Sequence, residues 1–145
     1  MDYRVERLRT PAECEIFAQN AKARNFPDLV LQAQRKAIHL HASKHETASE
    51  LEAEAFAAVY AYEVLLTRRN GKKTRATGVW QAIKRYGVIE AVERAVSRPA
   101  DGESPVTLRT LGLGDLAFEA LVMRNEASFS AAAISASKAR LAELT

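Results

Sequence analysis

The segment Leu116-Ala-Phe-Glu-Ala-Leu-Val-Met123 decides the fold that this sequence predicts. Glu119 is its one charged residue, and every other residue in it is apolar. A helix that is apolar almost all round is covered by its neighbours, whereas a surface helix has one polar face. We therefore expect residues 116–123 to form the central helix of a helical bundle.

The rest of the chain carries the same helical periodicity, divided by short turns. Only six glycines and four prolines occur in the 145 residues, and they lie between stretches with helical apolar spacing. Thr10–Glu13 and Thr47–Glu50 have the residues of capping boxes, and Pro11 suits the first helical position. The sequence predicts an all-α fold, a single compact bundle of six to eight helices. The expected helices span residues 11–24, 27–41, 48–69, 77–86, 88–98, 106–111, 116–123 and 130–144.

Glycines mark two of the expected helix ends. Asn70-Gly71 is typical of a helix stop because both residues tolerate a left-handed backbone, and Gly87 has the same role one helix later. Asn-Gly is also a strong hairpin signal, so a short β-ribbon within residues 64–79 is the competing interpretation. The helix is favoured because the preceding run is rich in alanine and glutamate. Residues 1–9 are expected to be an N-terminal tail, and residues 99–106 an exposed loop.

Length and composition describe one globular domain over residues 1–145. A chain of this size buries about two-thirds of its unfolded surface and needs no disulfide. Its single cysteine, Cys14, excludes an internal disulfide and a multi-thiolate zinc site, and its place on an apolar stripe indicates a buried thiol. No apolar run approaches the ~20 residues of a membrane span, and residues 1–10 lack the apolar core of a signal peptide. We expect a cytoplasmic protein with no membrane partner.

The charge is concentrated in one part of the chain. The whole sequence has 21 basic and 18 acidic residues, which gives a formal net charge of +3. Between Glu63 and Glu90 lie 26 residues with seven cations and no carboxylate, and the remainder holds 14 basic and 18 acidic residues. A basic patch on an acidic body orients a protein toward an anion through its own field. This asymmetry favours an anionic partner.

The residue types of this basic segment suit a nucleic-acid backbone. Cations at a helix end, together with hydroxyls near the start of the next helix, form a phosphate-binding arrangement. Thr74 and Thr77 are expected to cap that next helix and to bond phosphate oxygens. We predict a non-catalytic nucleic-acid-binding module, with DNA favoured over RNA, that uses a helix–linker–helix segment. The residues expected to contact nucleic acid are Arg68, Arg69, Lys72, Lys73, Thr74, Arg75, Thr77, Lys84 and Arg85.

Three stretches of the chain have a recognisable pattern, namely Arg69–Ala76 (RNGKKTRA), Trp80–Gly87 and Ala91–Val96. Through them the chain resembles a family of small bacterial all-helical proteins without an established activity. Thr10–Ala21 and Gly114–Ala120 are also similar, so the resemblance covers most of the chain. It implies a helical domain, and because related segments occur beside nuclease-like domains, it implies a nucleic-acid context. It transfers no catalytic residue.

Two other function classes stay open. In the first, the chain is a protein–protein adaptor whose basic segment docks on an acidic protein partner and whose alanine-rich last helix packs on another chain. In the second, a metal-dependent enzyme uses His39, His41 and His45. If their helix continues, His41 and His45 share a face and provide half of a zinc or iron site. The simpler interpretation is a solvated helix end, so no metal is predicted.

The sequence shows no catalytic motif, neither a Gly-rich phosphate loop nor the G-x-S-x-G and H-E-x-x-H patterns. Glu63 and Glu119 stand among apolar neighbours and are candidates for catalytic carboxylates. A lone acid on a helix also marks the solvent side, and that interpretation is favoured. Trp80 and Tyr86 have rings that stack on bases in other proteins, although the helical spacing of Trp80 favours the core. We expect no catalysis and no cofactor, and the oligomeric state stays open.

Overall fold

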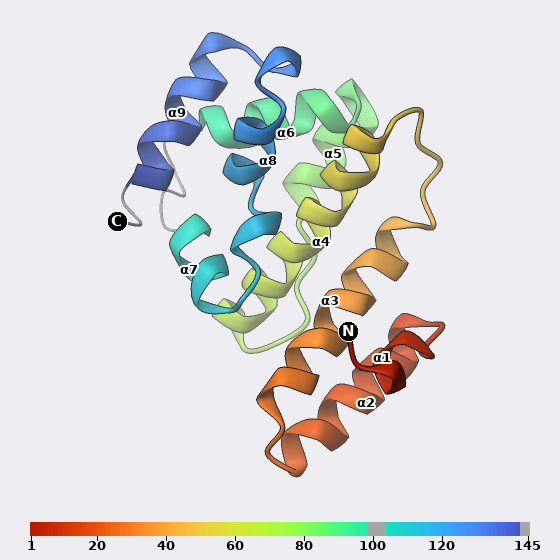
Figure 1. The fold of residues 1–145 in the computed structure, drawn as a ribbon. Coiled ribbons are helices and arrows are strands. Elements are labelled where there is room, and N and C mark those ends of the chain that lie inside the picture. Colours follow the sequence, from red (N-terminus) through yellow and green to blue (C-terminus); the bar gives the residue numbers. More distant parts are fainter. Residues whose placement is uncertain (99–103, 143–145) are drawn as a thin grey trace. The chain divides into compact units, whose positions relative to one another are not determined.

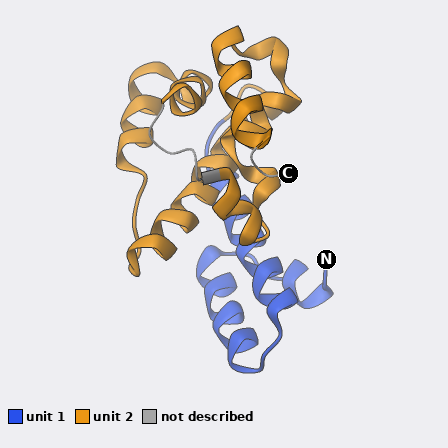
Figure 2. Cartoon of the chain, turned by 90° about the vertical axis from the view of Figure 1, so that its left-hand side faces the viewer, with its two compact units in different colours: residues 1–46 blue, residues 47–145 orange. Residues whose placement is uncertain are grey.

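The computed structural model describes residues 1–98 and 104–142, which form helices joined by turns. No β-strand occurs in these residues, so the all-α prediction is confirmed and the ribbon considered for residues 64–79 does not form. The chain divides into two compact units, Met1–Glu46 and Thr47–Thr145, which Figure 2 colours separately. The organisation of the chain as a single domain stays a prediction.

The first unit contains three helices. They are labelled in Figure 1 as α1 (Tyr3–Glu6), α2 (Pro11–Ala23) and α3 (Pro27–Ala42). The predicted capping box forms at α2. The Thr10 hydroxyl accepts a hydrogen bond from the Glu13 amide (3.1 Å), and the Glu13 carboxylate accepts one from the Arg9 amide (2.9 Å). Helices α2 and α3 pack together, and Cys14 is buried, as expected. Burial raises the pKa of the Cys14 thiol.

The tail expected over residues 1–9 is partly helical. Asp2 caps α1 by accepting a hydrogen bond from the Arg4 amide (2.8 Å), and its own amide donates to the Gln32 side chain of α3 (2.7 Å). Val5 is fully buried. The tail prediction is wrong here because a helix of one turn leaves no periodic pattern in the sequence.

The second unit contains the remaining helices. They are α4 (Glu50–Asn70), α5 (Thr77–Tyr86), α6 (Val88–Ser97), α7 (Ser104–Thr110), η2 (Gly114–Leu116), α8 (Phe118–Arg124), η3 (Glu126–Ser128) and α9 (Ala131–Ala142). Helix α4 begins at Ser49, whose hydroxyl accepts from the Glu52 amide (3.2 Å), while the Glu52 carboxylate accepts from the Ala48 amide (3.1 Å). The capping box therefore lies two residues beyond the predicted Thr47–Glu50. Among the described helices, none has both the length and the apolar character that crossing a membrane requires.

The exposed loop expected over residues 99–106 is described only in part, because residues 99–103 lie outside the described residues. From Ser104 onward the chain is already in α7, and Pro105 is fully buried. The loop prediction is therefore wrong for residues 104–106. Proline suits the first turn of a helix, because an N–H group there would have no intrahelical partner. The polar residues around Pro105 led instead to the prediction of a loop.

The segment that predicted the fold is buried in the second unit, as expected. It consists of η2, an extended Ala117 and helix α8. Phe118, Leu121 and Val122 are buried, and α8 packs against α4, α6 and α9 (Figure 1). Burying one such side chain stabilises a fold by roughly 1.5–3 kcal/mol. Helix α8 is thus buried among α4, α6 and α9.

Glu119 is buried as well, with 3% of its surface exposed, so the prediction that it marks a solvent side is wrong. Its Oε2 accepts a hydrogen bond from Arg140 Nη1 of α9 (3.0 Å), which makes a buried ion pair. Arg140 also donates to the backbone carbonyl of Arg98, directly after α6. The pair therefore ties α8, α9 and the end of α6 together.

Removing one partner of this ion pair leaves a buried charge without a counter-ion. We expect Arg140→Met to lower the free energy of unfolding by about 3–5 kcal/mol, measured by urea denaturation. The double variant Glu119→Leu/Arg140→Met removes both charges and should recover most of that loss. Glu90→Gln, which breaks the exposed ion pair with Arg94, should cost less than about 1 kcal/mol. Equal losses in the single and double variants would contradict this account.

Candidate functional site

One carboxylate fastens the linker between α4 and α5 to α4. Glu63 Oε2 accepts three hydrogen bonds, from Arg75 Nε (2.8 Å), the Ala76 amide (2.8 Å) and Trp80 Nε1 (2.6 Å). The Glu63 side chain is only 12% exposed, so it does not mark a solvent side, contrary to the prediction. The hydrogen bond to Glu63 raises the pKa of Arg75. Glu63 therefore acts as a structural anchor of the basic segment.

Trp80 is half-buried and belongs to an aromatic cluster next to this anchor. Its ring lies edge-on to Tyr60, with centroids 5.3 Å apart, and is stacked with Phe56 at 6.2 Å. The Arg75 guanidinium carbon lies 5.2 Å from the centre of the indole ring. Burial raises the pKa of the Tyr60 phenol. These contacts hold the start of α5 on the surface of α4.

Thr74 holds the turn of the linker itself. Its amide donates to the Thr67 hydroxyl on α4 (3.0 Å). Its hydroxyl accepts a hydrogen bond from Asn70 Nδ2 (3.2 Å) and donates to the Lys72 carbonyl (2.8 Å). The linker therefore folds back along the last turns of α4.

Neither threonine caps α5, so the capping prediction is wrong. The N-cap residue is Ala76, which makes no side-chain cap, and its amide is bound by Glu63 instead. Thr74 is engaged in the linker turn, and Thr77 is the exposed first residue of α5. The Glu63 carboxylate, thirteen residues earlier in the chain, binds the N–H of the N-cap residue itself and not the amides of the first turn that a threonine cap would bind.

Four of the predicted contact residues lie together where α4 ends. Arg68 and Arg69 occupy its last turn, where cations also suit the helix dipole. Lys72 and Lys73 follow Gly71, whose left-handed backbone (φ 72°) ends the helix as predicted. All four residues are exposed. We refer to Arg68, Arg69, Lys72 and Lys73 as the basic tip.

The other three predicted cations have different surroundings. Arg75 is paired with Glu63, although 59% of its side chain stays exposed. Lys84 and Arg85 are exposed on α5, but neighbouring residues of a helix point about 100° apart. Arg85 lines a pocket between α5 and α6, and Lys84 is not among its lining residues.

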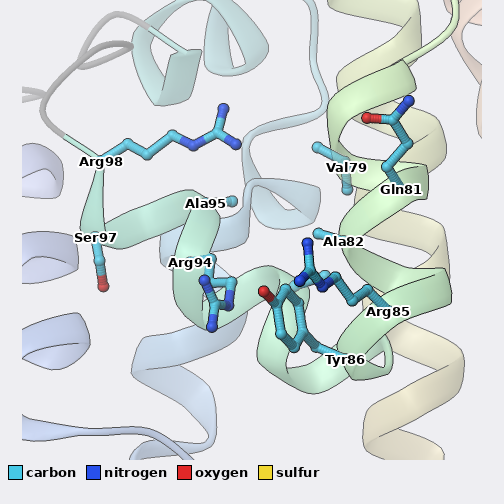
Figure 3. A pocket seen from close by; sticks show the side chains of 10 residues that line it. Val79, Gln81, Ala82, Arg85, Tyr86, Arg94, Ala95, Ser97 and Arg98 are labelled. Atoms are coloured by element: carbon cyan, nitrogen blue, oxygen red, sulfur yellow. The ribbon is translucent and has the colours of Figure 1, made fainter.

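This pocket, which we refer to as the arginine pocket, has a volume of about 500 Å³ (Figure 3). Three of its lining side chains are arginines, and within residues 1–98 and 104–142 no carboxylate lines it. It lies where α5 and α6 diverge from Gly87, whose backbone (φ 92°, ψ 163°) is a conformation essentially restricted to glycine. The lining residues are Val79, Gln81, Ala82, Arg85, Tyr86, Ala91, Arg94, Ala95, Ser97 and Arg98.

Tyr86 holds two of the three arginines. The guanidinium carbon of Arg94 lies 3.8 Å from the centre of the Tyr86 ring, and that of Arg85 lies 5.4 Å from it. Arg94 Nε also pairs with Glu90 Oε1 (3.3 Å). Figure 3 shows the third arginine, Arg98, reaching from the end of α6 toward α5.

Sequence reasoning missed Arg94 and Arg98. Both follow Glu90, where the acid-free run ends, so the charge pattern left them out. Gly87 was the signal in the sequence that could have placed these arginines near α5, because a glycine between two short helices lets the chain turn so that the second helix packs beside the first. Residues 94 and 98 are also four apart, the spacing of neighbours on one helix face.

The histidines do not form the half-site considered from their spacing. Helix α3 ends at Ala42, so His41 and His45 do not share one continued helix. His39 is exposed, and the other two are partly buried. Within residues 1–98 and 104–142, no group of three or more His, Cys, Asp or Glu side chains is placed to hold a metal ion.

Comparisons of the chain with models of known protein families, with curated proteins and with solved structures find no match. The resemblance to small bacterial helical proteins therefore stays a prediction, and the function has to be inferred from the residues themselves. The basic tip and the arginine pocket, both in the second unit, are the two candidate sites.

Glu63→Gln keeps the size of the anchor and removes its charge. Because three donors share the carboxylate oxygen, we expect the free energy of unfolding to fall by about 1–3 kcal/mol. The emission of Trp80, the single tryptophan, should shift to the red as its N–H loses a charged acceptor. Urea denaturation and fluorescence measure both effects. The control is Glu54→Gln, because Glu54 is exposed on the same helix, and it should change neither the free energy of unfolding nor the Trp80 emission. An unchanged Trp80 spectrum in Glu63→Gln would contradict the anchor role.

The turn between α5 and α6 requires glycine at position 87. We expect Gly87→Ala to lower the free energy of unfolding by about 1–3 kcal/mol, because a side chain is strained in this backbone conformation. Gly78→Ala is the matched control, since an added Cβ there meets no atom within 4 Å, and it should be neutral or stabilising by up to about 1 kcal/mol. Thermal denaturation compares the two variants, and equal stabilities would refute the requirement.

Proposed function

We propose that this chain is a non-catalytic nucleic-acid-binding module that contacts backbone phosphates through the basic tip and the neighbouring cations of α5, with DNA favoured over RNA. The observation that carries the proposal is the exposure of all four tip residues at one helix end. They belong to a run, residues 64–89, that contains no carboxylate. Cations gathered in a stretch of chain that has no carboxylate of its own attract a polyanion.

The linker presents its lysines on an ordered turn. Thr74 ties the linker to Thr67 and Asn70, and Glu63 holds the residues that follow. A backbone ordered before binding loses less conformational entropy when a ligand binds. Lys72 and Lys73 therefore contribute their charge from a fixed position of the chain.

The residue types support contact with phosphates and not the reading of bases. Lysine and arginine bind the backbone through charge, which carries no sequence information. Trp80, a ring considered for base stacking, is packed against Tyr60 and Phe56 and donates to Glu63. We expect binding that varies little with sequence and weakens steeply as salt is added.

Charge reversal on the basic tip tests the proposal. Lys72→Glu/Lys73→Glu should weaken binding to short duplex DNA at least about tenfold at low salt. Each phosphate contact that is lost should also reduce the slope of the logarithm of affinity against the logarithm of salt concentration by about 1. Fluorescence anisotropy measures both quantities, with single-stranded DNA and RNA of the same sequence as comparisons. Circular dichroism should be unchanged, because both lysines are exposed.

Lys22→Glu/Lys44→Glu is the matched control, since it makes the same charge change at exposed positions of the first unit. It should reduce affinity far less. Equal losses in the two double variants would refute a role for the tip. A stable complex with an acidic protein that resists nuclease treatment, without measurable binding to DNA or RNA, would replace this proposal with the adaptor function.

A further inference from the structure

We propose that the arginine pocket binds a phosphomonoester group, and that the group it takes is the terminal phosphate of a nucleic-acid strand. The identity of the ligand as a strand end rests on the proposed function. The pocket chemistry stands on the contacts between α5 and α6 alone.

The size and lining of the pocket favour a small anionic ligand. Its volume of about 500 Å³ falls within the roughly 300–1,000 Å³ of small-molecule sites. Arg85, Arg94 and Arg98 line it, no carboxylate of the described part of the chain does so, and alanines with Val79 form its apolar surface. A duplex is far too large for such a space, whereas one terminal group fits it.

Two of the guanidinium groups lie against one aromatic ring. The guanidinium carbons of Arg85 and Arg94 lie 5.4 Å and 3.8 Å from the centre of the Tyr86 ring, so at most about 9 Å separates them. Glu90, which is not among the lining residues, pairs with Arg94 (3.3 Å) and offsets one positive charge. A dianion in the pocket can offset the charges that remain.

Arg98 completes the set from a position tied to the core. Its backbone carbonyl accepts a hydrogen bond from Arg140, which is itself paired with buried Glu119. The rim of the pocket at the end of α6 is thus anchored to α8 and α9. Gln81 adds a neutral hydrogen-bonding group to the lining, whereas the Ser97 hydroxyl already donates to the Glu93 carbonyl (2.7 Å).

A terminal phosphate matches this set better than a backbone phosphate does. A phosphomonoester carries a charge of about −1.5 to −2 near neutral pH and has three acceptor oxygens. A backbone diester carries one negative charge and cannot enter without the chain on both of its sides. Guanidinium forks bind phosphate oxygens in pairs, which lysines cannot do.

The position of the pocket on α5 suits a strand that also contacts the basic tip. The tip precedes the start of α5, and Tyr86 is its last residue. A ten-residue helix is about 15 Å long, the length of roughly four nucleotides at ~3.4 Å per nucleotide. The linker, which folds back along the last turns of α4, adds to this distance, so a strand that contacts both sites has to be longer than four nucleotides.

The test compares oligonucleotides that differ only in their ends. The same single strand is prepared with a 5′-phosphate, with a 3′-phosphate and with hydroxyls at both ends. The protein should bind one phosphorylated form at least about tenfold more tightly than the hydroxyl form, as expected for two added charge-assisted hydrogen bonds. Arg94→Gln/Arg98→Gln should remove this preference, while Lys72→Glu/Lys73→Glu should weaken all three strands and keep it.

Lys22→Gln/Arg24→Gln, two exposed positions of the first unit, is the matched control and should keep the preference. Equal affinity of the unmodified protein for all three strands, or a preference that survives Arg94→Gln/Arg98→Gln, would overturn the proposal. Preferential binding of a phosphopeptide would overturn the assignment to a strand end. If no strand binds but inorganic phosphate does, and the arginine variant loses it, the pocket chemistry is supported and the proposed nucleic-acid function fails.

Discussion

A single carboxylate oxygen, Glu63 Oε2, holds the linker and the start of α5 in place. Three donors converge on it from Arg75, Ala76 and Trp80, so the linker and the first turn of α5 are both fixed to α4. An oxygen shared by three donors is favourable because the acceptor is charged and partly shielded from water. The same contact pairs one of the seven cations of residues 64–89 with a carboxylate that lies just outside that run.

The turn at Gly87 then determines which charges meet. Because α5 and α6 diverge from one residue with a backbone that only glycine readily adopts, Arg94 on α6 comes to lie on the ring of Tyr86 beside Arg85 of α5. The acid-free run and the arginine pocket therefore overlap at Arg85 without being the same feature. The run supplies the exposed basic tip, and the helix pair supplies a concave site of a different chemistry.

The stability of the second unit and the shape of the pocket are coupled through Arg140. This side chain neutralises Glu119 in the most buried helix and also binds the carbonyl of Arg98 at the pocket rim. A buried ion pair of this kind adds little net stability over an apolar pair, but losing one partner is costly. The pair therefore fixes the position of α6 relative to α8 and α9 more than it strengthens the core.

The sequence by itself determined the helical class and the ends of α4 and α5 at Gly71 and Gly87. It also determined the buried segment α8 and the strongly basic character of residues 64–89. Periodicity, caps and charge allow this because each is a pattern within one or two helical turns. Only the tertiary structure decided that Glu63 binds the linker and the start of α5, that Glu119 is paired inside, and that Arg94 and Arg98 line the same pocket as Arg85. Each of these depends on side chains brought together by packing between helices, at sequence separations where no local pattern records the partner. The short α1 was missed for a related reason, since Val5 is buried by contacts with another helix and not by a periodicity of its own.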